Sequence, residues 1–342
     1  MDATPRFLSA RPRTGMYESF YLRAVSPHEP LGVWIRNTVH KRPGDAPAGS
    51  VWCTVFDARR PAPYMHKLTS SQLEAPAGGW IEVAGRSRLG PGVAEGSCGE
   101  ARWELRFASP EPPLAHLQPS LLYRTPLPRT KLSTVAPAAR FEGTLELAGE
   151  KIELRDWPGM VGHNWGSEHA ERWIWLHGTA FAEQPSAWLD IALARIRIGG
   201  RLTPWIATGA LSVAGRRLRL GGLRAGRARV SESPAGCSVE LAAAHGLRVR
   251  VRAAVPGGSA AGWRYADPDG GEHDVLNCSI APIEVELVEQ GERRMLSSAH
   301  GGAYELGVRP PGEADDRGGA QPGEAGLGVR LAPFEDGGPP ER

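Results

Sequence analysis

Apolar and polar residues alternate along most of the chain with a period of two, the spacing of a β-strand that has one buried and one solvated face. In residues 247–253, for example, Leu247 and Val249 share one face while Arg248 and Arg250 occupy the other. Segments with this pattern or with a short apolar run are 32–40, 50–57, 79–85, 102–108, 140–149, 172–181, 187–198, 204–213, 237–244, 247–255 and 276–289. A 3.6-residue period almost never persists for three turns, so the pattern predicts an all-β protein with few or no helices.

Glycine and proline divide the chain into these short segments, with 43 glycines and 30 prolines in 342 residues. Antiparallel strands must form a sandwich or close into barrels to remove their edges, and we favour barrels. Residues 109–137 contain seven prolines and no clear periodicity, which is typical of a segment that crosses between domains. We therefore expect an N-terminal β-barrel at 1–112, a Pro-rich crossing segment at 113–138 and a C-terminal β-barrel at 139–310. The Gly-, Pro- and acid-rich composition of residues 311–342 predicts a largely disordered tail.

Charge and composition exclude several classes of function. The formal net charge is +2 and 41% of the residues are hydrophobic, which is typical of a globular protein. No run of about 18 apolar residues is present, so no integral membrane segment is predicted. The first residues lack the apolar region of a secretory signal, and we expect a cytoplasmic address. No basic stripe indicates nucleic-acid binding, no glycine-rich loop indicates a nucleotide cofactor, and the four cysteines form no CxxC pair.

Residues with reactive or ligating side chains are concentrated between Gly159 and Gly178. The stretch GMVGHNWGSEHAERWIWLHG contains His163, Trp165, Glu168, His169, Glu171, Trp173, Trp175 and His177. Its imidazole and carboxylate groups are of the type that ligates zinc or iron. However, their spacing is not that of an H-E-x-x-H helix, and the glycines predict a loop leading into a strand, so we predict no metal.

Two interpretations of this cluster remain open. Alternation along residues 172–178 places Trp173, Trp175 and His177 on one face, which could form the wall of an apolar pocket. Burial in such a pocket raises the pKa of a carboxyl group and prepares it to act as an acid. Alternatively, the tryptophans fill a core and the histidines brace turns.

The segment GMVGHNWGSEHAERWIWLHGTAF, with YESFYLRAVSP and VWIRNTVHKRPG before it and HDVLNCSIAP and GGAYELG after it, resembles the lipocalin-like superfamily. That superfamily includes hydroxyneurosporene synthase, the carotenoid hydratase, and more remotely tocopherol cyclase. The resemblance spans about Gly15 to Gly307. It implies two tandem antiparallel lipocalin-like β-barrels, with an apolar ligand in a barrel or between the two. It also implies protonation, hydration, cyclisation or pericyclic chemistry on isoprenoid or polyketide-like substrates, usually without a cofactor, and we expect none.

The resemblance further implies which residues lie near a ligand. In the enzymes of the superfamily, the Gly-rich, Trp-containing loop and the strand after it line the pocket. We therefore predict Glu168 and His169 as the catalytic acid or base. The predicted ligand-binding residues are His163, Asn164, Trp165, Trp173, Trp175 and His177. Hydratase-type members tend to carry an acidic residue beside a Trp or Tyr in this loop, whereas here Glu168 follows Trp165 by three residues. This departure counts against carotenoid hydration as the reaction.

Three functions follow from these observations. The first is a cofactor-independent hydratase, cyclase or isomerase that acts on a hydrophobic small molecule at the junction of the two barrels. The alternative is a non-catalytic, lipocalin-like lipid or isoprenoid carrier, in which the tryptophans form an apolar cup. In the third, the cluster is only interface core, and changing it would unfold the protein.

Overall fold

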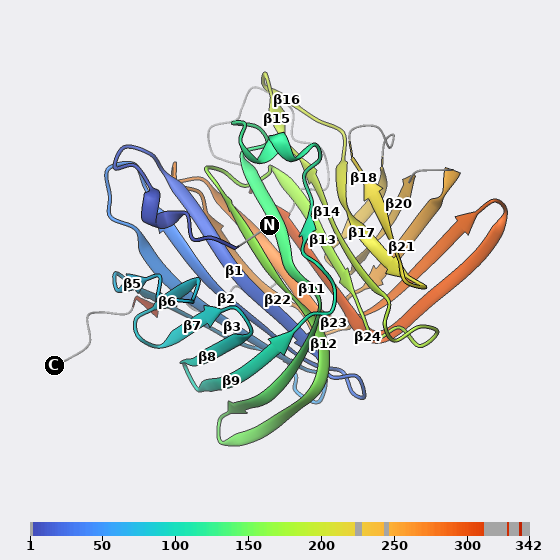
Figure 1. Cartoon of the computed structure of the whole chain (residues 1–342), viewed down its shortest axis with the longest axis horizontal. Coiled ribbons are helices and arrows are strands. Elements are labelled where there is room, and N and C mark those ends of the chain that lie inside the picture. Colours follow the sequence, from blue (N-terminus) through green and yellow to red (C-terminus); the bar gives the residue numbers. More distant parts are fainter. Residues whose placement is uncertain (1–2, 223–227, 243–245, 311–326, 328–334, 337–342) are drawn as a thin grey trace.

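The computed structural model describes residues 3–222, 228–242, 246–310, 327 and 335–336. The regular secondary structure of this part of the chain is almost entirely β, in two large sheets (Figure 1). The helical elements include two short 3-10 turns, η1 (Phe7–Ser9) and η2 (Ser120–Tyr123). The prediction of an all-β protein with few or no helices is therefore confirmed.

The first sheet has 13 strands and forms a nearly closed barrel. Its strands are β1 (Met16–Val25), β2 (Leu31–Lys41), β3 (Ala48–Asp57), β4 (Tyr64–Ser70), β5 (Leu73–Glu74), β6 (Ile81–Val83), β7 (Ser87–Gly90), β8 (Val93–Cys98), β9 (Ala101–Ala108), β10 (Leu114–Ala115), β11 (Thr130–Leu147), β12 (Glu150–Gly166) and β25 (Glu335–Asp336). Their order is β25-β4-β3-β2-β1-β12-β11-β9-β8-β7-β6-β5, with β10 on β11. All pairs are antiparallel except β25 with β4. Phe20, Ile35 and Trp103 are among the buried side chains of its core.

The second sheet has ten strands. They are β13 (Arg172–Gly178), β14 (Trp188–Arg195), β17 (Ile206–Val213), β18 (Arg216–Gly221), β19 (Arg229–Ser233), β20 (Gly236–Ala242), β21 (Arg248–Ala254), β22 (Ala261–Ala266), β23 (Glu272–Glu289) and β24 (Glu292–Val308). Their order is β18-β17-β14-β13-β24-β23-β21-β20-β19, with β22 on β23. A separate hairpin joins β15 (Arg197–Ile198) to β16 (Arg201–Leu202). Leu176, Ile191 and Val251 are buried in the core of this sheet.

Strand β12 corrects the expectation of a loop around Gly159 and Gly162. The glycines do not break the strand, because they serve close packing. A Cβ on Gly159 would lie 1.9 Å from the carbonyl oxygen of Arg23, and one on Gly162 would lie 2.3 Å from the ring of Tyr21. Neighbouring strands therefore approach β12 more closely than any other residue would allow.

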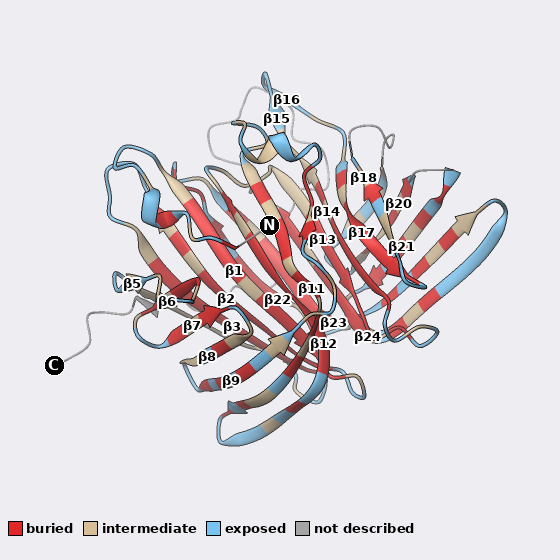
Figure 2. Cartoon of the chain, in the orientation of Figure 1, coloured by how far each residue is buried: buried red, intermediate tan, exposed pale blue. Residues whose placement is uncertain are grey.

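The two sheets contact each other through a buried aromatic cluster. Trp52 on β3 lies edge-on to Trp263 on β22, with ring centroids 5.1 Å apart. Trp34 on β2 packs against the same indole at 6.1 Å. Figure 2 shows buried residues concentrated along the long strands in the middle of the molecule. Large aromatic side chains supply much of the burial that holds such an interface together.

Arg23 on β1 is a charged side chain that is completely buried between the sheets. Its Nη2 donates to the carbonyl oxygens of Ser279, Gly301 and Gly302 at 2.8, 3.0 and 2.9 Å. Its Nη1 donates to Nδ1 of His177 at 2.8 Å. These carbonyls lie where the pairing of β23 with β24 is irregular. Burial lowers the pKa of Arg23 to about 9, and the side chain ties the first sheet to a bulge in the second.

The sheets do not divide the chain at the Pro-rich segment, because β11 begins within that segment, β12 follows it, and both belong to the first sheet. The chain enters the second sheet at Arg172. The predicted boundaries at residues 112 and 138 stay a prediction. The predicted disordered tail, 311–342, lies outside the described residues except for Leu327 and β25. Among the described residues, no helix has the length and apolarity needed to span a bilayer.

Candidate functional site

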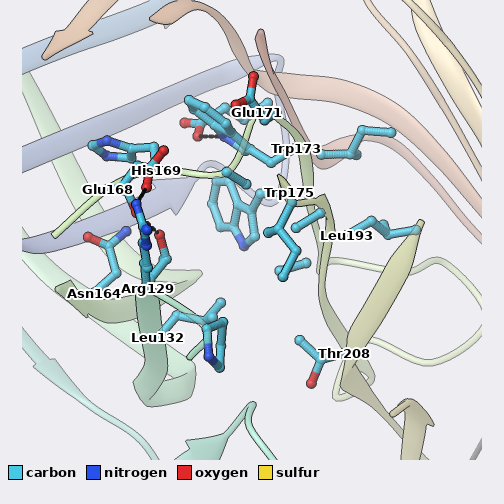
Figure 3. A pocket seen from close by; sticks show the side chains of 18 of the residues that line it. Arg129, Leu132, Asn164, Glu168, His169, Glu171, Trp173, Trp175, Leu193 and Thr208 are labelled. Carbon is cyan, nitrogen blue, oxygen red and sulfur yellow. Dashed lines mark hydrogen bonds and ion pairs between the residues drawn. The ribbon is translucent and has the colours of Figure 1, made fainter. Parts of the chain in front are cut away.

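A cavity of about 210 Å³ lies at the junction of the two sheets (Figure 3). The first sheet lines it with residues of β1, β2, β11 and β12, and the second with residues of β13, β14, β17, β22 and β24. Residues 127–129 of the Pro-rich segment and 168–171 of the loop between the sheets also line it. The cavity therefore depends on both sheets for its shape.

Aromatic and aliphatic side chains make up most of the wall. The aromatic lining residues are Tyr17, Tyr21, Trp34, Trp173, Trp175 and Tyr265. The alternation predicted for residues 172–178 brings Trp173 and Trp175 to the cavity together. An apolar wall with a few polar groups is typical of a small-molecule site.

His169 lines this cavity, and its side chain is 10% exposed. Its ring stacks on Tyr17, with centroids 4.0 Å apart. Its Nδ1 lies 2.6 Å from Oδ1 of Asp267. Burial alone raises the pKa of Asp267, but hydrogen bonds from His169 and His273 hold this pKa well below its usual value. The Asp267 carboxylate is therefore an acceptor, so that Nδ1 carries the proton and Nε2 is the acceptor nitrogen of His169.

The Nε2 atom of His169 is buried and has no hydrogen-bond partner among the described residues. Burial lowers the pKa of His169 to about 4, against the opposing effect of its hydrogen bond to Asp267. The imidazole is thus neutral at neutral pH. A neutral imidazole that a carboxylate holds in one tautomer is the arrangement of a general base.

Glu168, the residue before it, also lines the cavity, with a side chain that is 19% exposed. Its Oε2 accepts a hydrogen bond from Arg129, and Figure 3 shows these two side chains directed toward each other. Its Oε1 accepts from Nη2 of Arg309 at 3.2 Å, and the same nitrogen lies 3.3 Å from Oδ2 of Asp267. Because both carboxylate oxygens are bound to guanidinium groups, the geometry suits Glu168 to holding the loop better than to transferring protons.

A second carboxylate in the wall belongs to Glu305 on β24. Its Oε1 accepts from Nε1 of Trp173 at 2.9 Å, and its Oε2 accepts from Asn277 and from the hydroxyl of Tyr265 at 3.1 and 3.3 Å.

Tyr21 is a potential hydrogen-bond donor in the same wall. Burial raises the pKa of Tyr21 well above its usual value. Its hydroxyl therefore stays protonated and can donate a hydrogen bond to a ligand.

A buried polar network fixes the indole of Trp175. Its Nε1 donates to Oδ1 of Asp190 at 3.0 Å. The other carboxylate oxygen of Asp190 accepts from the hydroxyl of Thr134 and lies 3.4 Å from Nε2 of His116. Burial raises the pKa of Asp190, but the neighbouring His116 and Thr134 lower it, so that this pKa lies below its usual value. A fixed buried charge therefore sets the orientation of this indole in the wall.

The predicted ligand-binding residues separate into two groups. Asn164 lines the cavity with Trp173 and Trp175, whereas His163, Trp165 and His177 do not line it. His163 Nε2 lies 2.8 Å from a carboxylate oxygen of Glu18, Trp165 lies under the guanidinium of Arg6, and His177 accepts from Arg23. On β12, Asn164 points to the face opposite that of its two neighbours because side chains alternate. A direct role of the three in ligand binding stays a prediction.

Asp267, Glu305 and Asp190 were missed by sequence reasoning. Asp267 lies beyond the end of β22, 98 residues from His169, and nothing local marks it as the partner of an imidazole. Glu305 stands in the segment GGAYELG, where a lone acid among apolar strand residues was an available signal. Asp190 stands in the apolar run AWLDIALA, where the same signal was present.

One group among the described residues brings metal-ligating atoms together: His169, Asp267 and His273, within 4.8 Å of one another. The Asp267 carboxylate already accepts hydrogen bonds from both imidazoles, at 2.6 and 2.9 Å. Of the ligands considered from the sequence, His163 and His177 are bonded elsewhere, to Glu18 and Arg23. The prediction of no metal stays a prediction.

The buried histidines predict a loss of stability in mild acid. Burial lowers the pKa of His169 to about 4 and, with Arg23 adding to it, that of His177 to about 3. Both pKa values lie below the ordinary histidine value of about 6.5, so the unfolded chain binds more protons than the folded protein between about pH 6.5 and 4. We expect the free energy of unfolding to fall by about 2–4 kcal/mol between pH 7.5 and 5.

Urea denaturation across this pH range measures the effect. His169→Gln is expected to make the dependence on pH shallower, whereas replacing the exposed His28 by Gln should leave it unchanged. An identical slope in the wild type and in the His169→Gln variant would contradict the assignment of a neutral, buried imidazole.

No protein-family model matches the chain. Two uncharacterized proteins of Mycobacterium tuberculosis, from strains CDC 1551 and H37Rv, are each 27% identical to it over 307 residues, covering 83% of this chain and 84% of the relative. A solved structure described as AttH, from Nitrosomonas europaea, aligns with a TM-score of 0.52 at 12% identity, over 87% of this chain and 93% of that one. Kievitone hydratase from Nectria haematococca aligns with a TM-score of 0.52 at 10% identity, over 90% and 91% of the two chains. The likeness is one of fold, and this chain has a lipocalin-like β-barrel fold.

Proposed function

We propose that this protein binds a hydrophobic, isoprenoid or polyketide-like small molecule between its two sheets and performs cofactor-independent acid–base chemistry on it, as a hydratase, cyclase or isomerase. The observation that carries this proposal is an aromatic-walled cavity lined by His169, a neutral imidazole whose Nδ1 is fixed by Asp267. The wall selects an apolar ligand, and the oriented imidazole supplies a base.

The fold supports the same class of function. One of the solved structures that share it is named as a hydratase. The resemblance to the hydroxyneurosporene synthase type points the same way and would make the two sheets tandem barrels with a ligand at their junction. A cavity at that junction suits the proposal.

The size of the cavity limits what it encloses. Its volume of about 210 Å³ is below the range of about 300–1,000 Å³ that is common for sites enclosing drug-sized ligands. A small ring system fits this volume. A long isoprenoid would enter by one end, with the remaining chain outside the cavity.

The residues suit chemistry on a conjugated carbonyl compound. In a hydration, Nε2 of His169 takes a proton from water while the water oxygen bonds to the carbon at the far end of the conjugated double bond. The electron pair of that double bond forms a new double bond to the carbonyl carbon, and the π pair of the carbonyl group moves to its oxygen, to which the Tyr21 hydroxyl donates a hydrogen bond. The proton then passes from His169 to the carbon next to the carbonyl, which completes the addition of water. An isomerisation uses the same groups, with the first proton taken from carbon.

In this proposal Glu168 has a supporting role. Its pairing with Arg129 and Arg309 fixes the loop that carries His169, and Arg309 also contacts Asp267. Glu168→Gln keeps the size of the side chain and removes its charge. The same experiments on this variant therefore test the prediction that Glu168 itself transfers a proton.

Mass spectrometry of small molecules extracted from the purified protein tests the proposal. The extract is compared with that of a His169→Gln variant, and the recovered compound is then incubated with each protein in the presence of EDTA. A compound whose mass changes by 18 Da, or whose retention time changes at constant mass, only with the wild type supports catalysis. The same unchanged compound in both proteins indicates a carrier and overturns the enzymatic part of the proposal.

Filling the cavity is expected to abolish ligand binding. Ala192 on β14 lies between Trp175 and Thr208 in the register of the sheet, and all three line the cavity. An indole at this position takes up much of the space, so Ala192→Trp should weaken binding of the extracted compound by about 100-fold or more. Quenching of tryptophan fluorescence on titration measures the affinity. The matched control is Ala254→Trp on the exposed face of β21, which should bind as the wild type does. Equal binding by both variants would place the ligand elsewhere.

A further inference from the structure

Exposed apolar side chains are concentrated in two segments of the chain. Among the described residues, seven large hydrophobic side chains are exposed, and five of them lie in residues 121–127 and 198–206. The five are Leu121, Leu127, Ile198, Leu202 and Ile206, with exposed fractions of 37–62%. Single exposed apolar residues are ordinary, but several on one surface mark an interaction site.

Both segments border the cavity. Leu127 lines it from the Pro-rich segment, and Ile196 and Ile206 line it from the second sheet. Figure 1 shows the β15–β16 hairpin and the Pro-rich segment together at the top of the view, and Figure 2 shows much of this end exposed. We call residues 121–129 and 196–206 the mouth rim. Leu127 and Ile206 are both exposed and part of the lining, so exposed apolar groups border the open side of a cavity that is itself mostly apolar.

The mouth rim is also basic. It contains four arginines and no Asp or Glu. Arg124 and Arg201 are exposed, and within the described part of the chain neither side chain forms an ion pair or hydrogen bond. Two of the acidic residues that line the cavity, Glu168 and Glu171, are already paired with arginines, and the third, Glu305, accepts hydrogen bonds from Trp173, Asn277 and Tyr265. The positive charge of Arg124 and Arg201 is therefore available to an anionic partner.

We infer that the mouth rim docks on the surface of an anionic lipid bilayer, with the cavity opening toward the membrane. Apolar side chains interspersed with arginines are the pattern of proteins that lie in the bilayer interface, where the apolar groups enter the acyl boundary and the arginines contact lipid phosphates. Trp205, partly exposed within the rim, has the amphipathic ring that such interfaces favour.

The bilayer fits the observations better than another protein does. Docking would place the cavity entrance against the phase in which an apolar ligand dissolves. It would also shelter the part of a long ligand that a cavity of about 210 Å³ leaves outside. The purpose of the contact rests on the proposed function. The contact itself does not, because vesicle binding is measured without any ligand.

Co-sedimentation of the full chain with vesicles tests the inference. Vesicles of phosphatidylcholine alone are compared with vesicles containing about 30 mol% phosphatidylserine. We expect binding to the anionic vesicles, weakened by added salt because exposed charges are screened. Arg124→Glu/Arg201→Glu and Ile198→Asp/Leu202→Asp should each weaken this binding by about tenfold or more.

The matched control lies on the tip of the β23–β24 hairpin, which Figure 1 shows at the right of the view, away from the mouth rim. Met295 there is 43% exposed and follows the exposed Arg294. Arg294→Glu/Met295→Asp makes the same kind of changes and should bind vesicles as the wild type does. Thermal melts of all variants check that each is folded.

Failure of the wild type to bind anionic vesicles overturns the inference, as does an equal loss of binding in the control variant. A protein partner that binds the rim while vesicles do not would overturn it in the same way. None of these results affects the proposed function, which depends on ligand binding and turnover in the cavity.

Discussion

His169→Gln is expected to lower turnover by about 10²–10⁴-fold while changing the affinity for the ligand by less than about tenfold. Glutamine keeps much of the volume beside Tyr17 and Trp173 but supplies no basic nitrogen. In the proposed function the ligand contacts the aromatic wall, which the substitution leaves in place. Rates under single-turnover conditions, with the compound recovered from the protein, separate the loss of chemistry from a loss of binding.

The pH dependence of kcat/KM distinguishes a base from a structural histidine. Because the pKa of His169 is lowered to about 4, the imidazole is in its basic form above that pH. The rate should therefore be level from pH 8 to about 5 and fall below about 4, in so far as the protein stays folded. Asp267→Asn should also lower turnover strongly, since an amide can stabilise the other tautomer. The exposed His28→Gln is the control, and a His169→Gln rate within about threefold of the wild type would refute the assignment.

Arg23→Ala is expected to lower the free energy of unfolding by about 3–5 kcal/mol. The substitution leaves three buried carbonyl oxygens without the donors that Nη2 supplies and opens a void between the sheets. Arg23→Met restores most of the volume but none of the hydrogen bonds, so it should recover only part of the loss. Denaturation by urea at pH 7.5 gives both values.

The control for this prediction is Arg264→Met on β22, whose ion pairs with Glu272 and Asp274 are at the surface. Removing them should cost less than about 1 kcal/mol. Equal effects at Arg23 and Arg264 would show that the buried guanidinium does not hold the two sheets together.

Much of the fold was predictable because strand formation depends on local pattern. Alternation within residues 172–178 correctly predicted a strand with Trp173 and Trp175 on one face, since the two-residue period of a strand is set by backbone geometry alone. The segment around Gly159 and Gly162 was wrongly predicted as a loop. Glycine is required at these positions because Arg23 and Tyr21 on the paired strand approach too closely to leave room for a side chain. That contact cannot be read from the local sequence.

The sequence by itself determined the all-β class, most strand positions and the stretch of chain that holds His169, Trp173 and Trp175, because each depends on residues that are near one another in the chain. Only the tertiary structure decided which polar groups meet. Pairing of β13 with β24 brings Glu305 to Trp173 across 132 residues. The fold also brings Asp267, just after β22, to His169 in the loop between the sheets, across 98 residues. The protonation of a buried group is set by such distant partners and by burial, and neither is encoded in the local alternation of side chains.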